Sequence, residues 1–366
     1  MVNKKIEILL KVIGVVLALY LFLVGINGLS SGIKGLGGDF AKNVMSTTSN
    51  PFVALFIGIL ATTLFQSSST TSSLIVAMVA GGTLTLSGAV PMIMGANIGT
   101  TVTNTIVSIG HIKQGNEFKR AFQAATVHDF FNVLAVIILF PIELMFGLIE
   151  KTASGLGILL FGTLSTEEVF KSPVKAAIKW GAKKLEFLSF DNEIVYIIIS
   201  ILLTFLMLYC IVKLLRSLVL AKVETFFDNY IFKTAIRAMV FGMLLTISVQ
   251  SSSITTSTVI PLAGAGVLTL RQIYPFTLGA NIGTTVTALL ASLTLNVTAM
   301  VAAFAHLFFN IFGILIIYAN PILREIPLKL SVAFADLAIK NKIYPILYLI
   351  VVFFLTPFLI IFLGGK

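Results

Sequence analysis

The sequence predicts an all-α polytopic membrane protein with two inverted-topology repeats, re-entrant hairpins and discontinuous helices. Three observations predict this fold class. The 366 residues are 57% hydrophobic and only 11% charged, whereas soluble domains carry about a quarter charged residues. Several apolar stretches reach or approach the roughly 20 residues that span a bilayer as a helix. The chain also contains an internal repeat. Soluble enzymes and nucleic-acid-binding proteins are therefore excluded, and the net charge of +10 reports membrane topology.

The apolar segments define the expected elements in chain order. They lie at 6–28, 51–65, 70–82, 87–110, 121–148, 194–212, 234–249, 254–267, 272–293, 298–320 and 343–363. The first follows Lys4 and Lys5 and is long for a signal peptide, so we expect a retained helix. The second and third are too short to cross alone and flank the polar run Gln66-Ser67-Ser68-Ser69, which indicates a re-entrant hairpin or a discontinuous helix.

The internal repeat divides the chain into two homologous halves. Residues 66–103 align without a gap to residues 250–287, and 20 of these 38 positions are identical. The shared motifs are Gln-Ser-Ser-Ser at 66–69 and 250–253, Gly-Ala-Asn-Ile-Gly-Thr-Thr-Val-Thr at 95–103 and 279–287, and His-x-Phe-Phe-Asn at 128–132 and 306–310. We expect a first transmembrane repeat at 1–150, a connector at 151–193, a second repeat at 194–340 and a C-terminal helix at 341–366.

The positions of Lys and Arg predict how the repeats face the membrane. Lysines at 4, 5 and 11 place the N-terminus inside, and Lys119 with Arg120 follows the next inward crossing. On this path the connector is extracellular, and Lys233 with Arg237 places the start of the second hairpin inside. The second half therefore begins on the opposite face from the first, which is an inverted repeat. The lysines of the connector argue mildly against this topology.

The polar runs predict an anion site without any basic residue. Each Gln-Ser-Ser-Ser run precedes an apolar half-helix, so its serines should form the N-cap and first turn, where backbone N–H groups are free and the helix dipole is positive. Each Asn-Ile-Gly-Thr-Thr run indicates a second break, with Gly99 and Gly283 easing the turn and Asn97 or Asn281 capping the next helix. Two such repeats would bring up to four helix ends to the bilayer midplane.

The same loops are rich in oxygen ligands. Amide carbonyls, Thr hydroxyls and unwound backbone carbonyls suit a hard cation such as Na⁺, and they include no soft ligand for a transition metal. One alternative is that the Ser, Thr and Gly residues serve close helix packing, which the duplication makes less attractive. A Ser nucleophile with His128 or His306 as base is a weaker alternative. We expect both histidines to satisfy local hydrogen bonds.

Asp129 is the acid deep within the segment 121–148. Burying a carboxylate inside a membrane costs free energy, so its presence there indicates a functional role. Its repeat partner is Leu307, so the two halves differ here. An unpaired negative charge would favour an additional cation in the first half. The alternative is a structural partnership with His128 or Arg120.

The duplicated Gln-Ser-Ser-Ser runs resemble the hallmark of the type II sodium-dependent phosphate cotransporter family. The stretches 93–107 and 125–129 are also similar to that family. The resemblance implies sodium-driven uptake of inorganic phosphate, with the Gln-Ser-Ser-Ser residues at the substrate. It also implies one sodium site with Asp129, Thr105 and Asn132, and a second with Gln250, Ser251, Thr284 and Thr287.

Together these inferences give the expected site. The phosphate-binding residues are Gln66, Ser67, Ser68, Ser69, Asn97, Gln250, Ser251, Ser252, Ser253 and Asn281. The sodium-binding residues are Thr100, Thr101, Thr105, Asp129, Asn132, Gln250, Ser251, Thr284, Thr285 and Thr287. No cofactor, enzymatic activity or nucleic-acid partner is expected.

The short connector and the single cysteine, Cys210, depart from the animal members, which carry a disulfide between the repeats. These features fit a prokaryotic plasma-membrane protein. The oligomeric state is left open. A sodium-coupled carrier of another small anion, such as a dicarboxylate, and a passive anion channel remain as alternatives.

Overall fold

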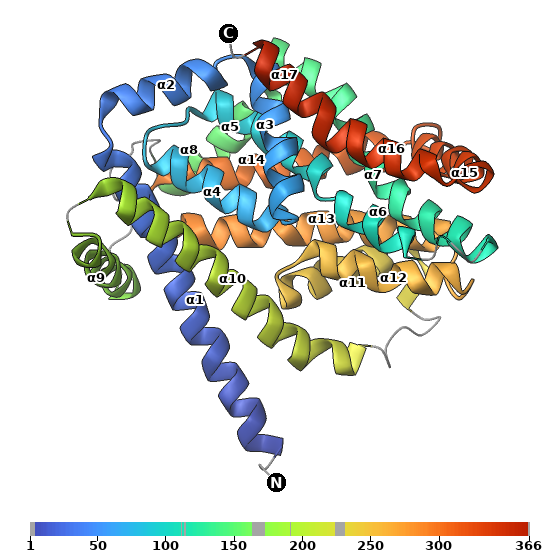
Figure 1. Cartoon of the computed structure of the whole chain (residues 1–366), viewed down its shortest axis with the longest axis horizontal. Coiled ribbons are helices and arrows are strands. Elements are labelled where there is room, and N and C mark those ends of the chain that lie inside the picture. The colour runs from blue at the N-terminus through green and yellow to red at the C-terminus, as the bar shows by residue number, and fades with distance from the viewer. Residues whose placement is uncertain are drawn as a thin grey trace.

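The computed structural model confirms an all-α protein (Figure 1). It describes residues 4–110, 112, 115–162, 173–190, 192–223 and 231–364, and this part of the chain contains helices and no strand. The helices of the first half are α1 (Lys4–Gly35), α2 (Gly38–Thr48), α3 (Pro51–Phe65), α4 (Ser68–Ala80), α5 (Leu86–Gly99), α6 (Val102–Ile109), α7 (Asn116–Phe146), α8 (Leu148–Phe161) and α9 (Pro173–Leu188). The second half comprises α10 (Glu193–Val223), η1 (Ile231–Lys233), α11 (Ala235–Val249), α12 (Ser252–Gly264), α13 (Leu270–Ser292), α14 (Val297–Gly313), η2 (Ile314–Tyr318), α15 (Glu325–Lys340), α16 (Ile343–Ile350), η3 (Val351–Leu355) and α17 (Thr356–Gly364).

The protein is a multi-pass membrane protein. Among the described residues, five helices are long and apolar enough to cross a bilayer: Ile6–Gly35, Asn116–Phe146, Glu193–Leu215, Val297–Tyr318 and Ile343–Gly364. A sixth span is possible if α2 and α3, bent by 99°, count as one broken crossing. The shorter apolar helices α4 and α11 are the half-length elements that the sequence places beside the two polar runs.

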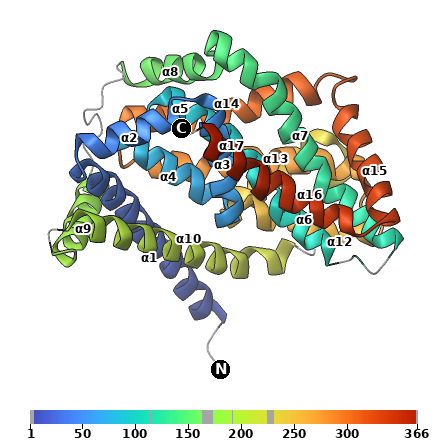
Figure 2. The ribbon, with the colours of Figure 1, turned by 45° about the horizontal axis from the view of Figure 1, so that its top comes forward.

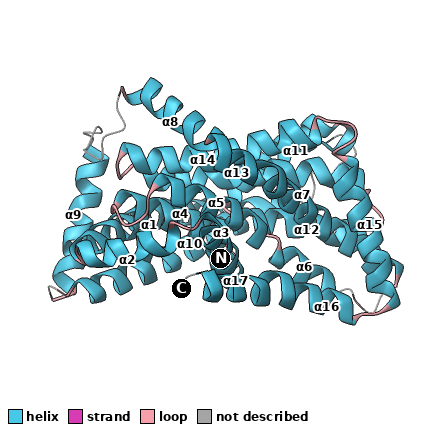
Figure 3. Cartoon of the chain, turned by 90° about the horizontal axis from the view of Figure 1, so that it is seen from above, coloured by secondary structure: helices cyan, strands magenta, loops and turns pink. Residues whose placement is uncertain are grey.

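The internal repeat is visible in the order of the helices. Helices α3 and α4 of the first half correspond to α11 and α12 of the second, α5 with α6 corresponds to α13, and α7 corresponds to α14. The predicted segment 51–65 is helix α3. Helix α13 lies in the middle of the molecule in all three views, and most of its residues are buried (Figures 1 to 3). The Asn-Ile-Gly-Thr-Thr run of the second half is therefore in the interior.

Paired glycines let two helices of each repeat touch backbone to backbone. A Cβ atom on Gly95 would lie 1.9 Å from the carbonyl oxygen of Leu55, so α5 crosses α3 where only glycine fits. Gly279, at the same position of the second repeat, would meet the carbonyl oxygen of Met239 at 1.8 Å. Small residues at such crossings are typical of membrane helices, because close approach replaces the missing hydrophobic driving force. The repeated glycines thus set the position of each hairpin relative to the helix that follows it.

Of the expectations about the Asn-Ile-Gly-Thr-Thr runs, only the break in the first run is confirmed. Only the first run contains a break, at Thr100 and Thr101 between α5 and α6, whereas α13 is continuous. Asn97 and Asn281 lie inside helices and cap nothing. A Cβ atom on Gly99 would meet the Ile59 carbonyl oxygen at 2.6 Å, and one on Gly283 would meet the Met243 carbonyl oxygen at 2.7 Å, so both glycines serve close packing, and Gly283 lies at no backbone turn.

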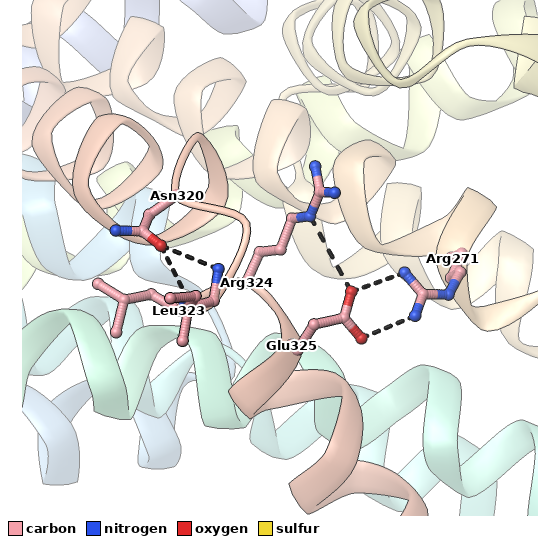
Figure 4. Close-up of polar contacts among 6 residues, drawn as sticks. Arg271, Asn320, Leu323, Arg324 and Glu325 are labelled. Carbon is pink, nitrogen blue, oxygen red and sulfur yellow. Dashed lines mark hydrogen bonds and ion pairs between the residues drawn. The ribbon is translucent and has the colours of Figure 1, made fainter.

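A peripheral ion pair ties α13 to α15 (Figure 4). Arg271 donates from both terminal nitrogens to Glu325, each at 2.7 Å, and Arg324 lies 4.0 Å from the same carboxylate. The bidentate hydrogen bond from Arg271 lowers the pKa of the Glu325 carboxyl below its usual range. Both groups are near water, so the pair fixes orientation more than it adds stability.

Candidate functional site

The two Gln-Ser-Ser-Ser runs form matching hairpin tips. Gln66 and Gln250 end α3 and α11 in the left-handed conformation, with φ of 50° and 56°. Ser67 and Ser251 are extended N-caps whose hydroxyls accept from Thr70 N at 3.2 Å and Ile254 N at 3.3 Å. The expectation that the serines form the N-cap and first turn is therefore confirmed.

The remaining serines of each run lie in the first turn and are buried. They are Ser68, Ser69, Ser252 and Ser253. At the start of a helix they stand beside backbone N–H groups that lack an intrahelical acceptor and carry partial positive charge. Two helix N-termini inside the protein can thus offer N–H and O–H donors to an anion.

Thr287 connects the two hairpin tips. Its hydroxyl lies 2.8 Å from Gln250 Oε1 in its own repeat and 3.4 Å from Ser69 Oγ in the other. The structure thus brings both Gln-Ser-Ser-Ser runs and one Thr of α13 to a single region. Gln66 is the exception, since its side chain is exposed while Gln250 is half-buried.

The repeated threonines of the two Asn-Ile-Gly-Thr-Thr runs form local hydrogen bonds. Thr100 and Thr284 donate to the carbonyls of Ala96 and Ala280, at 3.0 and 3.1 Å. Thr101 and Thr285 likewise donate over 2.7 Å to carbonyls three residues earlier. Their hydroxyl oxygens keep lone pairs for a cation, but these contacts alone do not form a ligand cage.

A directional chain of buried hydrogen bonds crosses between the repeats. Asn104 Nδ2 can only donate, so His128 Nδ1 accepts from it at 3.4 Å and His128 Nε2 carries the proton that meets Asn281 Oδ1 at 2.6 Å. Asn281 Nδ2 donates to Asn132 Oδ1 at 2.9 Å, and Asn132 Nδ2 donates to the Asn97 carbonyl at 2.8 Å. Asn97, Asn132 and Asn281 are thus brought together. His128 bonds across the repeats, so the expectation of purely local bonds is wrong for it.

Asp129 lies fully buried beside this chain with one oxygen occupied. Its Oδ2 accepts from Thr105 Oγ1 at 3.2 Å and from Tyr348 OH at 3.4 Å, while Oδ1 has no hydrogen-bond partner within the described chain. The expected neighbour Asn132 bonds to Asn97 and Asn281 instead. Neither proposed structural partner pairs with Asp129, since His128 takes the bonds above and Arg120 Nε donates to the carbonyls of 263 and 264.

The second repeat holds the same residues in a different arrangement. His306 and Asn310 are buried, and both ring nitrogens of His306 and Oδ1 of Asn310 lack a partner among the described atoms. The expectation of a satisfied histidine is wrong here. A cavity of about 320 Å³ lies beside Ser253 and is lined by Thr103, Val107, Ser253, Ile254, Ser257 and Thr258.

Sequence reasoning missed four polar residues of this region. Thr256 and Ser257 donate to Asn104 Oδ1 at 2.8 and 3.3 Å, and Tyr348 reaches Asp129 from α16. The repeat could have pointed to Ser257, whose partner is Ser73, but not to Asn104, whose partner is Ala288. Tyr348 lies outside both repeats, so only the tertiary structure places it at the carboxylate.

The site's repeated motifs agree with a family comparison. Residues 21–166 and 197–326 match a family model described as Na⁺/Pi-cotransporter. The chain belongs to this family. The family is one of transporters, not of enzymes.

Curated members of the Na⁺/Pi-cotransporter family are about one third identical to the chain. Sodium-dependent phosphate transport protein 2B of Pongo abelii is 33% identical over an alignment of 435 positions, gaps included, which covers 93% of this chain and 63% of that protein. The 2A proteins of Oryctolagus cuniculus and Mus musculus are 33% and 34% identical, each over 96% of this chain and 67% of their own length. The chain thus spans about two thirds of these relatives. No solved structure matches the chain.

Proposed function

We propose that the chain is a sodium-coupled secondary transporter that imports inorganic phosphate by alternating access. Its family and the printed names of its relatives support the substrate class. The single observation that carries the proposal is the contact of Thr287 with Gln250 and Ser69. This contact joins the tips of two half-helices from opposite repeats, which is where a transporter of this architecture holds its substrate.

Phosphate would bind between the tips of the hairpins. The donors are the serine hydroxyls and free N–H groups at the starts of α4 and α12, together with the amides of Gln66, Asn97, Gln250 and Asn281. None of these groups is basic, so positive charge must come from helix dipoles and from the coupling ions. A carbonyl acceptor among the amides would recognise the proton of hydrogen phosphate, which sulfate lacks.

Sodium would bind to the oxygen groups beside the phosphate. Gln250 Oε1 and the hydroxyls of Ser251, Thr284 and Thr287 offer neutral hard ligands at the second hairpin. The free Oδ1 of Asp129 with Thr105 Oγ1 offers a charged position in the first half. Two Na⁺ neutralise a divalent phosphate, so a third ion at Asp129 would make transport electrogenic, and each net charge moved is worth about 2.3 kcal/mol per 100 mV.

Uptake into proteoliposomes tests the function. Purified protein should accumulate ³²P-phosphate against a gradient when Na⁺ is outside, and replacing Na⁺ with choline should abolish accumulation. Equilibration without accumulation would identify a passive channel and refute the proposal. Competition by succinate but not by phosphate would identify a dicarboxylate carrier.

The role of Asp129 is tested by phosphate-induced current. Asp129→Asn keeps the hydrogen bond from Thr105 but removes the charge, so uptake should become electroneutral and the current should vanish. An unchanged current would exclude a cation at Asp129. Ser72→Ala, a buried change in α4 whose hydroxyl donates only to the Ser69 carbonyl, serves as the matched control.

The same proposal covers the setting of the protein. We propose a prokaryotic plasma membrane, with phosphate, Na⁺ and the lipid bilayer as partners and no resident cofactor.

A further inference from the structure

The second repeat contains counterparts of the His and Asn residues that join the repeats, but their hydrogen bonds are not formed. In register, His306 corresponds to His128, Asn310 to Asn132, and Asn97 to Asn281. His128 and Asn132 both bond to the side chain of Asn281. Their counterparts should bond to Asn97 in the same way, but His306 Nδ1 and Nε2 and Asn310 Oδ1 have no partner among the described atoms.

The corresponding atoms are held by local bonds that a side-chain rotation could break. Asn97 Nδ2 donates to the Ile93 carbonyl at 2.9 Å, four residues earlier in α5. Asn310 Nδ2 donates to the His306 carbonyl at 3.1 Å, again four residues earlier. Leaving buried polar atoms unpaired is unfavourable. Because the corresponding atoms of the first repeat are paired with Asn281, three unpaired atoms at the equivalent positions indicate a second arrangement that pairs them.

The hairpin tips also differ between the repeats, and the bonded tip belongs to the repeat whose His-Asn pair is not bonded. Thr287 is bonded to Gln250 and Ser69, so this contact is closed. Thr103, its counterpart, has a hydroxyl without a partner in the described structure, and a cavity of about 320 Å³ lies between it and Ser253, the counterpart of Ser69. In the second half the threonine at the tip is bonded and the His-Asn pair is not. In the first half the His-Asn pair is bonded and the threonine at the tip is not.

We propose that His306 and Asn310 are positioning residues of the oppositely open state, in which they bond to Asn97 as His128 and Asn132 bond to Asn281 here. The exchange makes His306 Nε2 donate to Asn97 Oδ1, and Asn97 Nδ2 donate to Asn310 Oδ1. At the same time the bonds of His128 and Asn132 to Asn281 open, and the cavity beside Ser253 closes. The inference deepens the proposed alternating access and rests on it.

The exchange is not symmetric in energy. His128 also accepts from Asn104, which in turn accepts from Thr256 and Ser257. Ala288 stands at the position of Asn104 in the second repeat, so the exchanged network has fewer bonds. The observed state should therefore be the more populated one without substrate.

A thiol reporter tests the exchange without relying on phosphate transport. In the full chain carrying Cys210→Ser, Thr258→Cys places one thiol on the cavity wall, and its rate of modification in lipid nanodiscs reports how much protein is in the observed state. His306→Phe removes both orphaned nitrogens and should leave the modification rate and melting temperature equal or higher. Phosphate uptake should fall about tenfold or more, the factor that corresponds to about 1.4 kcal/mol against the exchanged state.

His128→Phe is the matched control because it makes the same change where the bonds exist. It should lower the melting temperature and shift the ratio of the two states about tenfold, which slows modification of the thiol. His306→Gln retains an amide that can pair with Asn97 and should restore much of the uptake. If His306→Phe does not fold, Asn310→Leu replaces it, with the same expected modification rate, melting temperature and loss of uptake.

The proposal is overturned if His306→Phe slows modification as His128→Phe does, since His306 would then support the observed state. Unchanged uptake in His306→Phe would overturn it as well. If the unsubstituted chain transports another anion or none, the reporter rates still decide the exchange, because only His128→Phe should slow modification of the thiol. The two proposals can therefore fail separately.

Discussion

Replacing Thr287 with Val tests whether the contact between the hairpin tips stabilises the protein. The two side chains have the same shape, so the change opens no cavity and removes only the hydroxyl. The lost bonds are those to Gln250 Oε1 at 2.8 Å and Ser69 Oγ at 3.4 Å. The first is well formed, and the second is at the outer limit of a hydrogen bond.

The magnitude follows from the burial of the acceptor. Gln250 is half-buried, so water can partly replace the missing donor and the loss should be about 1 kcal/mol, in the middle of the range for a hydrogen bond in proteins. In a chain of this size that corresponds to a fall of about 2 °C in melting temperature. If Thr287 and Gln250 also hold Na⁺, the half-saturating Na⁺ concentration for uptake should rise about fivefold.

Melting in detergent and sodium titration of uptake are the two assays. Thr103→Val is the matched control for melting, because it makes the same change at the equivalent position, where the hydroxyl has no partner in the described structure. It should leave the melting temperature unchanged or slightly raised. Equal melting temperatures of the two variants would refute the reasoning for Thr287.

Three further changes have definite expected outcomes. Gly95→Ala places a Cβ atom 1.9 Å from a carbonyl oxygen of α3 and should destabilise the protein by about 3 kcal/mol or more, so an unchanged melting temperature would contradict the close helix crossing. Tyr348→Phe removes one donor to the Asp129 carboxylate and should change the sodium dependence of phosphate-induced current by roughly twofold to tenfold, whereas an unchanged dependence would separate α16 from the ion site. Because Arg271 lowers the pKa of Glu325, that ion pair stabilises the protein above the ordinary pKa of 4.5 and is lost as the pH falls below it. In Glu325→Gln the melting temperature should therefore fall less between neutral and acid pH, and an equally steep fall would show that the pair contributes nothing.

Much of the candidate site could be read from the sequence because its signal is local and occurs twice. The Gln-Ser-Ser-Ser runs interrupt apolar stretches, and a polar interruption inside a membrane leads directly to a hairpin tip with serine caps. The second type of motif was less informative. Asn-Ile-Gly-Thr-Thr is the same in both halves, yet it breaks the helix only in the first, since helix continuity depends on the surrounding packing.

The pairing of polar side chains could not be predicted for a related reason. Asn104 and Tyr348 have no counterpart in the repeat, so duplication gave no sign of them. His128 and His306 are equivalent by sequence, but one is fully hydrogen-bonded and the other has no partner among the described residues. Which of two equivalent positions is bonded therefore depends on the side chains that the tertiary structure places beside each of them.

The sequence by itself determined the membrane environment, the duplication, and the hairpin tips with their serine caps. These properties follow from hydropathy and local backbone chemistry, which act within a few residues. Only the tertiary structure decided which oxygens and nitrogens meet across the repeats, because those contacts join residues about 150 positions apart, as in the pairs His128 with Asn281 and Asn104 with Thr256. In a duplicated protein the sequence supplies two matching sets of groups, and the packing of the helices decides which set is bonded.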